Sequence, residues 1–200
     1  MKKALTWIAI LLLAGCGGPA TTVKETEGST TGSRLVTMSG GFIDEAGQGD
    51  DPEVSQLNPW IEIDRKTGIA GYMGVTLTRV VADPEIFRTH APRYLEVGTN
   101  DELRITVGSS TVVLHAMGVS KRWHLNKQDV GGYKTTTYFE EVRYSGSTSD
   151  MELLAKGPIT RISASGSKGG TYWPRPDHTL LPGYQSQFNT FYKEQIAPAL

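Results

Sequence analysis

Apolar and polar residues alternate along most of this chain in short runs, a pattern typical of β-strands with one buried face. The alternating runs are 34–38, 60–64, 69–81, 94–97, 103–107, 111–117 and 119–125. Polar residues and glycines separate them, and Arg65-Lys66-Thr67-Gly68 and Gly108-Ser109-Ser110 form the clearest turn signals. Strands joined by turns roughly every 8–12 residues predict a mainly β chain, folded as an antiparallel β-sandwich or a barrel-like sheet.

The spacing becomes helical at two places near the C-terminus. Ser149-Asp150-Met151-Glu152 has the sequence of a capping box and Gly157 is a stop signal, so we expect a short helix over about 149–156. A packed helix is expected over 182–200, where a stripe of apolar side chains recurs at helical intervals. The stripe consists of Tyr184, Phe188, Phe191, Tyr192 and Ile196. These helices leave α+β as the alternative fold class.

The first sixteen residues show another pattern, in which Lys2 and Lys3 precede an apolar run that ends in Leu13-Ala14-Gly15-Cys16. A transmembrane helix needs about 20 apolar residues, whereas this run meets Gly17-Gly18-Pro19. The pattern therefore predicts a cleaved signal peptide over 1–15. Leu13 to Cys16 resembles the lipobox of bacterial lipoproteins, and Cys16 is the only cysteine in the chain.

The lipobox resemblance implies that Cys16 is lipid-modified and anchors the mature protein to a membrane of the cell envelope. Several acyl chains, at about 0.8 kcal/mol per buried CH₂, make such an anchor effectively permanent. Glycine, rather than aspartate, follows Cys16, which by this resemblance favours the outer membrane, facing the periplasm. Residues 19–33 are polar and rich in Thr, Gly, Ser and Glu, so we expect a flexible tether over 16–33 and a single β-rich domain over 34–200.

Composition narrows the classes of partner. The formal net charge is −1, and it becomes −3 when the signal peptide with Lys2 and Lys3 is removed. Neither sign forms a long block, so no nucleic-acid surface is expected. With Cys16 committed to lipid, a monomer has no internal disulfide. No motif in the sequence implies a cofactor.

One carboxylate occupies an unusual position in the clearest strand, 133–144. Alternation places Glu140 on the same face as Tyr138, Val142 and Tyr144. A buried carboxylate must be paired or protonated. We expect a structural ion pair with an arginine on a neighbouring strand, such as Arg161, and the alternative is a catalytic acid.

The segment between the last strand and the last helix combines aromatic residues, an arginine and two prolines. Loops of this kind suit the binding of glycans or partner proteins, although they also pack as lids over the open end of a sheet. Tyr172, Trp173 and Arg175 are therefore the candidate binding residues.

No catalytic or metal-binding motif stands out. The four histidines, at positions 90, 115, 124 and 178, lack the spacings of metal sites, and G-x-S-x-G does not occur. Ser165-Gly166-Ser167-Lys168 matches S-x-x-K, but it follows a strand, whereas the serine of that motif begins a helix.

The block from Tyr138 to Gly166, with Glu140, Val142 and Tyr144 followed by a capped helix, a strand and a glycine, resembles a segment of uncharacterised β-rich bacterial envelope proteins. This resemblance implies architecture and no activity. We expect a membrane-anchored lipoprotein whose domain is a non-enzymatic binding or assembly module for a protein or cell-wall partner. The alternatives are a cell-wall or glycan-directed hydrolase that uses a strand carboxylate, and a structural envelope component.

Overall fold

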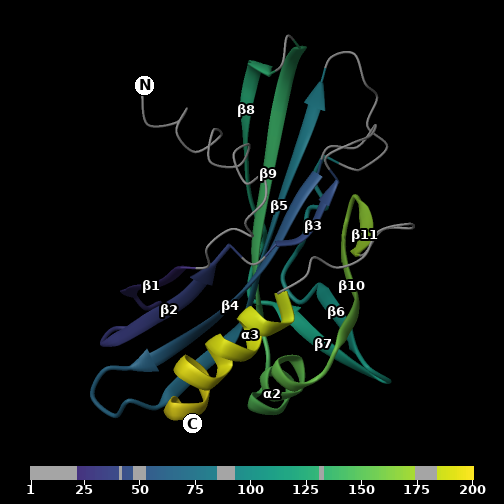
Figure 1. Cartoon of the computed structure of the whole chain (residues 1–200). Coiled ribbons are helices and arrows are strands. Elements are labelled where there is room, and N and C mark those ends of the chain that lie inside the picture. The colour runs from purple at the N-terminus through teal and green to yellow at the C-terminus, as the bar shows by residue number, and fades with distance from the viewer. Residues whose placement is uncertain (1–21, 41, 47–52, 85–92, 131–132, 174–183) are drawn as a thin grey trace.

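The computed structural model describes residues 22–40, 42–46, 53–84, 93–130, 133–173 and 184–200, and eleven strands within them form one antiparallel sheet (Figure 1). The strands are β1 (Thr22–Glu27), β2 (Ser33–Ser39), β3 (Phe42–Ala46), β4 (Glu53–Asp64), β5 (Ala70–Pro84), β6 (Glu102–Val107), β7 (Ser110–Ala116), β8 (Lys121–Val130), β9 (Tyr133–Ser145), β10 (Ile159–Gly166) and β11 (Gly169–Trp173). Their order is β1-β2-β4-β5-β9-β7-β6-β10-β11, with β3 beside β4 and β8 beside β9. The mainly β, antiparallel prediction is confirmed, and the described sheet is open.

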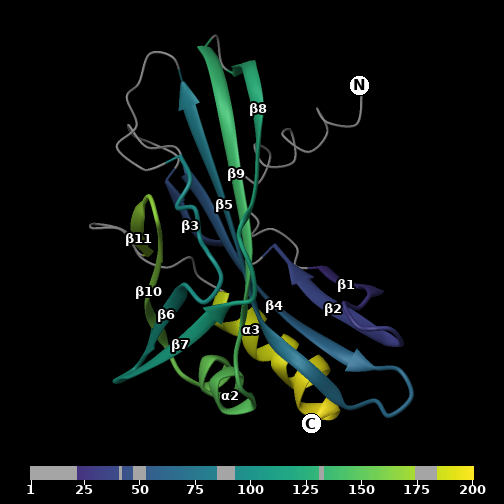
Figure 2. The same cartoon turned by 180° about the vertical axis from the view of Figure 1, so that it is seen from behind.

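The long strands β4, β5 and β9 form the centre of the sheet. The β4–β5 hairpin is the predicted one, and its turn is held by Asp64, whose carboxylate accepts hydrogen bonds from Lys66 N at 2.9 Å and Thr67 N at 2.8 Å. Gly68 completes the turn with a φ of +72°. Together with β8, the far ends of β5 and β9 extend beyond the part of the sheet that the helices cover (Figures 1 and 2).

One face of the sheet carries the hydrophobic core. Alternate residues of the central strands, including Leu57, Ile61, Val75, Leu77 and Tyr144, point to this face and are fully buried. Side chains of β6, β7, β10 and β11 join the same cluster, as do those of the helices α2 (Thr148–Lys156) and α3 (Tyr184–Phe191). We call the opposite face of the central strands the outer face.

The N-cap of helix α2 lies two residues before the predicted cap. Its N-cap is Ser147, which accepts a hydrogen bond from Asp150 N, while the Asp150 carboxylate accepts one from Ser147 N. The capping box predicted at Ser149 is therefore wrong in register, because aspartate instead of Glu152 occupies the third helical position.

Helix α3 continues through a π-helical turn (Tyr192–Ile196) and a 3-10 turn (Ala197–Ala199) to the C-terminus. Phe188, Phe191 and Ile196 of the predicted stripe are buried in the core. The amides of Gln185 and Asn189 donate hydrogen bonds to the last carbonyl groups of α2 at 2.7–3.2 Å. These bonds satisfy acceptors that a helix end leaves open and fix α3 beside α2.

The tether prediction is wrong for residues 22–27. They form β1, which pairs with β2 along its whole length. All six residues are exposed, so the strand contributes main-chain hydrogen bonds and almost no apolar burial. The hydropathy pattern contained no signal for β1, because main-chain hydrogen bonds to β2 hold the strand and no apolar face is buried.

The strand expected over 94–97 is also absent from the described structure, where 93–101 is an irregular segment. Glu96 and Asn100 have φ values of +55° and +71°, which regular strands exclude. Among the helices in the described residues, none has the length and apolar character needed to cross a membrane.

Candidate functional site

Glu140 lies on the core side of β9 and is 2% exposed. Its carboxylate accepts hydrogen bonds from Leu95 N at 2.6 Å, Val97 N at 3.2 Å and Ser120 Oγ at 2.7 Å. Arg79, which is directly opposite Glu140 in the β5–β9 ladder, places Nη1 3.6 Å from the same carboxylate and is 1% exposed. The expected structural ion pair is therefore present.

The partner of Glu140 is not Arg161. That residue lies on β10, which β6 and β7 separate from β9, and its side chain is exposed. The sequence contained a signal for the true partner, because Arg79 interrupts an alternating apolar face formed by Val75, Leu77 and Val81. Such an arginine needs a buried anion.

The irregular segment at 95–97 is shaped around the Glu140 carboxylate. The left-handed conformation of Glu96 turns the N–H groups of Leu95 and Val97 toward one anion, as in an anion-binding nest. The β10–β11 turn covers the other side, where Lys168 N donates to Leu95 O at 3.0 Å. A Cβ on Gly166 would lie 2.2 Å from Leu95 O, so glycine is required there. The S-x-x-K sequence is thus part of a structural turn.

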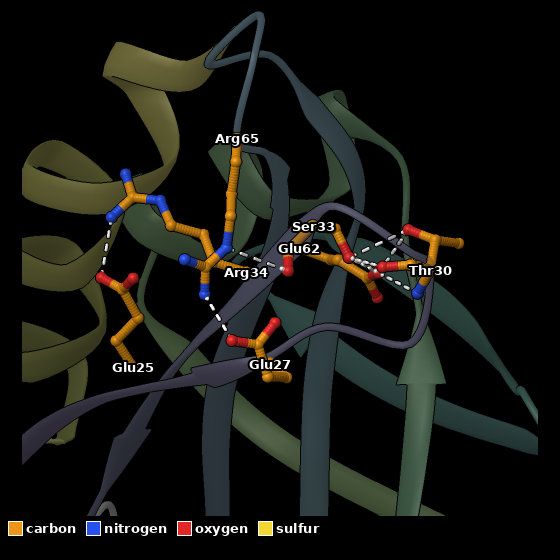
Figure 3. A network of polar contacts seen from close by, with 7 residues as sticks. All are labelled: Glu25, Glu27, Thr30, Ser33, Arg34, Glu62 and Arg65. Atoms are coloured by element: carbon orange, nitrogen blue, oxygen red, sulfur yellow. Dashed lines mark hydrogen bonds and ion pairs between the residues drawn. The ribbon is translucent and has the colours of Figure 1, made fainter.

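Glu62 on β4 is a second buried carboxylate, and it holds the turn between β1 and β2 (Figure 3). It accepts hydrogen bonds from Ser29 Oγ at 2.6 Å, Thr30 N at 2.9 Å, Thr30 Oγ1 at 2.8 Å and Ser33 Oγ at 2.5 Å. Burial alone raises the pKa of Glu62, but the hydrogen bonds from Ser29, Ser33 and Thr30 outweigh it and lower the pKa to about 2. A carboxylate with this pKa is a weak general base.

Exposed ion pairs flank this network. Arg34 binds Glu25 at 2.8 Å and Arg65 binds Glu27 at 3.0 Å, so both arginines tie β1 to its neighbours (Figure 3). Solvent-exposed pairs contribute little stability each. Both pairs nevertheless hold the last residues of β1, next to the turn that the Glu62 network fixes.

The predicted aromatic binding loop is not supported by the position of Trp173. Its side chain is fully buried in the core, opposite Ile162 in the β10–β11 ladder, so it cannot contact a partner on the surface. Tyr172 follows Thr171 in β11, where only its main-chain position is described. Arg175 and Cys16 lie outside the described residues.

A groove of about 340 Å³ lies on the outer face and has a lining of mixed polarity. We call it the outer groove. It lies between the β1–β2 turn and the connection from β7 to β8, over β4 and β9. Its lining consists of Ser29, Trp60, Glu62, Met117, Gly118, Val119, Lys121, Glu141, Val142 and Arg143.

The rim of the outer groove is apolar. Met117 is 46% exposed and Val119 is 68% exposed, which is unusual for residues in a short connection that could have been polar. Met117 N donates to Arg143 O at 2.9 Å, so the connection is attached to β9. Exposed apolar side chains next to charged ones are a feature of interaction sites.

The outer groove contains two cations, Lys121 and Arg143, and each lies over a tryptophan ring, of which only Trp60 is among the lining residues. The Arg143 guanidinium lies over the Trp60 ring at 5.9 Å, and Lys121 Nζ lies over the Trp123 ring at 5.7 Å. Trp123 in turn stacks on Phe139, with ring centroids 5.2 Å apart. The Trp60 Nε1 atom is buried and has no hydrogen-bond acceptor in the described structure.

A smaller groove of about 260 Å³ lies over β6, β10 and β11 and includes Arg104, Arg161 and Ser165. Arg104 is already paired with Glu102 at 2.5 Å. Within the described ranges, no three histidine, cysteine or acidic side chains are close enough to hold a metal ion.

Sequence reasoning missed the outer groove because its residues come from four separate stretches, around 29, 60–62, 117–121 and 141–143. Only Met117 and Val119, at the facing ends of two predicted strands, were a local signal. The sequence matches no protein-family model, no curated protein and no solved structure.

Proposed function

We propose that this chain is a lipid-anchored protein of the bacterial cell envelope, outer membrane and periplasmic side, whose domain binds a partner in the outer groove and catalyses no reaction. The observation that carries the proposal is the groove itself, with exposed Met117 and Val119 around Lys121 and Arg143. These features are those of a recognition surface.

The alternative of a glycan-directed hydrolase has less support. Its best acid, Glu140, is buried among three hydrogen-bond donors and Arg79, so substrate cannot reach it. Glu62 lines the outer groove, but its carboxylate already accepts four hydrogen bonds from the β1–β2 turn. Neither carboxylate is placed to transfer a proton to a ligand.

The anchor places a limit on where the partner can be. Five residues lie between Cys16 and Thr22, where β1 begins. Over these six residue steps an extended chain advances at most about 3.6 Å per residue, or roughly 20 Å in total. A lipid on Cys16 therefore keeps the domain close to the membrane surface, and the proposed partner is a protein or wall component near that surface.

Anchoring is tested by comparing the wild-type chain with Cys16→Ser. The proposal expects incorporation of a labelled fatty acid and membrane fractionation for the wild type, and neither for the variant. A wild-type chain that carries no label would contradict the anchoring proposal.

Binding is tested with the mature chain carrying Cys16→Ser, incubated with purified envelope fragments. Met117→Ser combined with Val119→Ser is expected to lower the bound fraction, because it removes the apolar rim. Ile69→Ser is the matched control, since Ile69 is 58% exposed in the β4–β5 turn and does not line the groove. Equal binding by all three proteins would contradict the assignment of the groove.

A further inference from the structure

The two cations of the outer groove are available to a ligand. In the part of the chain that the structure describes, Lys121 and Arg143 make contacts with aromatic rings and no ion pair. Glu141 lies directly opposite Lys121 in the β8–β9 ladder and supplies one negative charge. Glu62 also lines the groove, so its two cations are matched by two acidic side chains, and the attraction for an anion is local to Lys121 and Arg143.

Glu62 does not neutralise these cations by direct contact. Its oxygens accept hydrogen bonds from Ser29, Thr30 and Ser33, which fix the carboxylate in the β1–β2 turn. The guanidinium of Arg143 therefore keeps its planar array of donors for another acceptor. Such an array matches the two oxygens of a carboxylate.

The aromatic residues argue against a glycan in this groove. Sugars need an open aromatic face, but Trp60, the tryptophan among the lining residues, is 1% exposed and Arg143 covers its ring. The apolar surface that remains open is aliphatic, at Met117 and Val119. Aliphatic side chains of a ligand can pack there and lose contact with water.

Resting on the proposed binding function, we infer that the outer groove recognises a peptide segment in which a carboxylate lies next to an aliphatic side chain. The carboxylate binds Arg143 and Lys121, and the aliphatic side chain packs between Met117 and Val119. The volume of about 340 Å³ is near the lower end of ligand pockets, about 300–1,000 Å³. A short segment of a partner fits this space, and a folded domain does not.

The test uses the mature chain with Cys16→Ser, labelled with ¹⁵N, and two pools of N-acetylated, C-amidated tetrapeptides. One pool contains aspartate or glutamate flanked by leucine or valine, and the other replaces each acid by its amide. The mature chain has three tryptophans, at 60, 123 and 173, so its indole N–H signals are easily resolved. The acidic pool is expected to shift the signals of Trp60 and Lys121, and to leave that of the buried Trp173 unchanged.

Arg143→Gln and Lys121→Gln should each weaken binding of the acidic pool by about tenfold, the usual effect of losing a charge-assisted contact. Arg104→Gln is the control, because Arg104 is an exposed arginine outside the outer groove. A circular dichroism spectrum and melting temperature equal to the wild type will show that each variant folds.

Three results would overturn the inference. Equal shifts from the acidic and amide pools would show that the groove binds peptide without recognising a carboxylate. If neither pool shifts the groove signals, while Met117→Ser with Val119→Ser still weakens envelope binding, the ligand is not a peptide of this kind. Groove shifts caused only by phosphatidylglycerol vesicles would assign the surface to lipid.

Discussion

Replacing Glu140 by glutamine tests the buried ion pair that joins β5, β9 and the segment at 95–97. The substitution keeps the size of the side chain and removes its charge. It leaves the Arg79 guanidinium, 1% exposed, facing a neutral amide, and it weakens the bonds from Leu95 N and Val97 N. Breaking a buried pair by removing one partner costs about 3–5 kcal/mol.

For a chain of this length, each kcal/mol changes the melting temperature by about 2–4 °C, so we expect Glu140→Gln to melt about 6–20 °C lower than the wild type. Urea unfolding followed by tryptophan fluorescence measures the free energy directly, since Trp60 and Trp173 are both buried. Glu152→Gln is the matched control. It breaks the exposed Glu152–Lys156 pair on α2, and pairs of this kind contribute about 0.3–0.5 kcal/mol.

A double-mutant cycle separates the pair from its surroundings. Arg79→Met should cost less in the Glu140→Gln background than in the wild type, with a coupling energy of about 0.5–3 kcal/mol. If Glu140→Gln lost no more stability than Glu152→Gln, the structural role assigned to Glu140 would be refuted. A fully stable variant with a lost activity would instead point to catalysis.

Other substitutions test the packing and the turns. Tyr144→Phe should keep or raise the free energy of unfolding, because the buried Tyr144 hydroxyl has no hydrogen-bond partner in the described structure; a loss above 1 kcal/mol would show a missed bond. Gly166→Ala should destabilise the protein, since its Cβ would lie 2.2 Å from Leu95 O, whereas Gly118→Ala meets no atom within 4 Å and should be neutral. Similar melting temperatures for the two variants would contradict this packing. Because the pKa of Glu62 falls from 4.5 to about 2, its carboxylate contributes stability above pH 4.5 that is lost as the pH falls toward 2, at most about 3 kcal/mol. Glu62→Gln should therefore make the free energy of unfolding depend less on pH below 4.5. An unchanged pH dependence would show that the Glu62 network does not stabilise the fold through its charge.

Periodicity was sufficient for elements whose residues bury a regular face. The β4–β5 hairpin and α3 were predicted because their apolar residues repeat at intervals of two or of three to four, and α2 was predicted from its cap and stop signals. The face that holds Glu140 was predicted for the same reason, and burial of that residue confirmed it. In each case the local sequence contained the information.

Features that depend on distant segments were not predictable. Strand β1 has six exposed residues and exists only because β2 offers a free edge. The segment at 95–97 bends around a carboxylate that is more than 40 residues away. The identity of Arg79 as the ion-pair partner required knowledge that β5 lies beside β9.

The outer groove had the least sequence signal of all. Strand order brings Trp60, Lys121 and Arg143 together, and no local pattern links them. Trp173 of the predicted aromatic site is not on the surface for a related reason, because aromatic residues serve cores as often as surfaces. Trp173 belongs to the core cluster that the sheet and the helices share, and sequence alone could not place it there.

The most direct test of the proposed function is site-specific photo-crosslinking in the native envelope. A photoreactive residue at position 119 of the lipid-anchored chain should form a discrete adduct, because position 119 is on the rim of the outer groove. The adduct should be lost from a chain that also carries Met117→Ser. The same residue at position 69, on the exposed β4–β5 turn, should form none. Identical adducts from positions 119 and 69, or no adduct from position 119, would contradict the claim that this groove binds a partner.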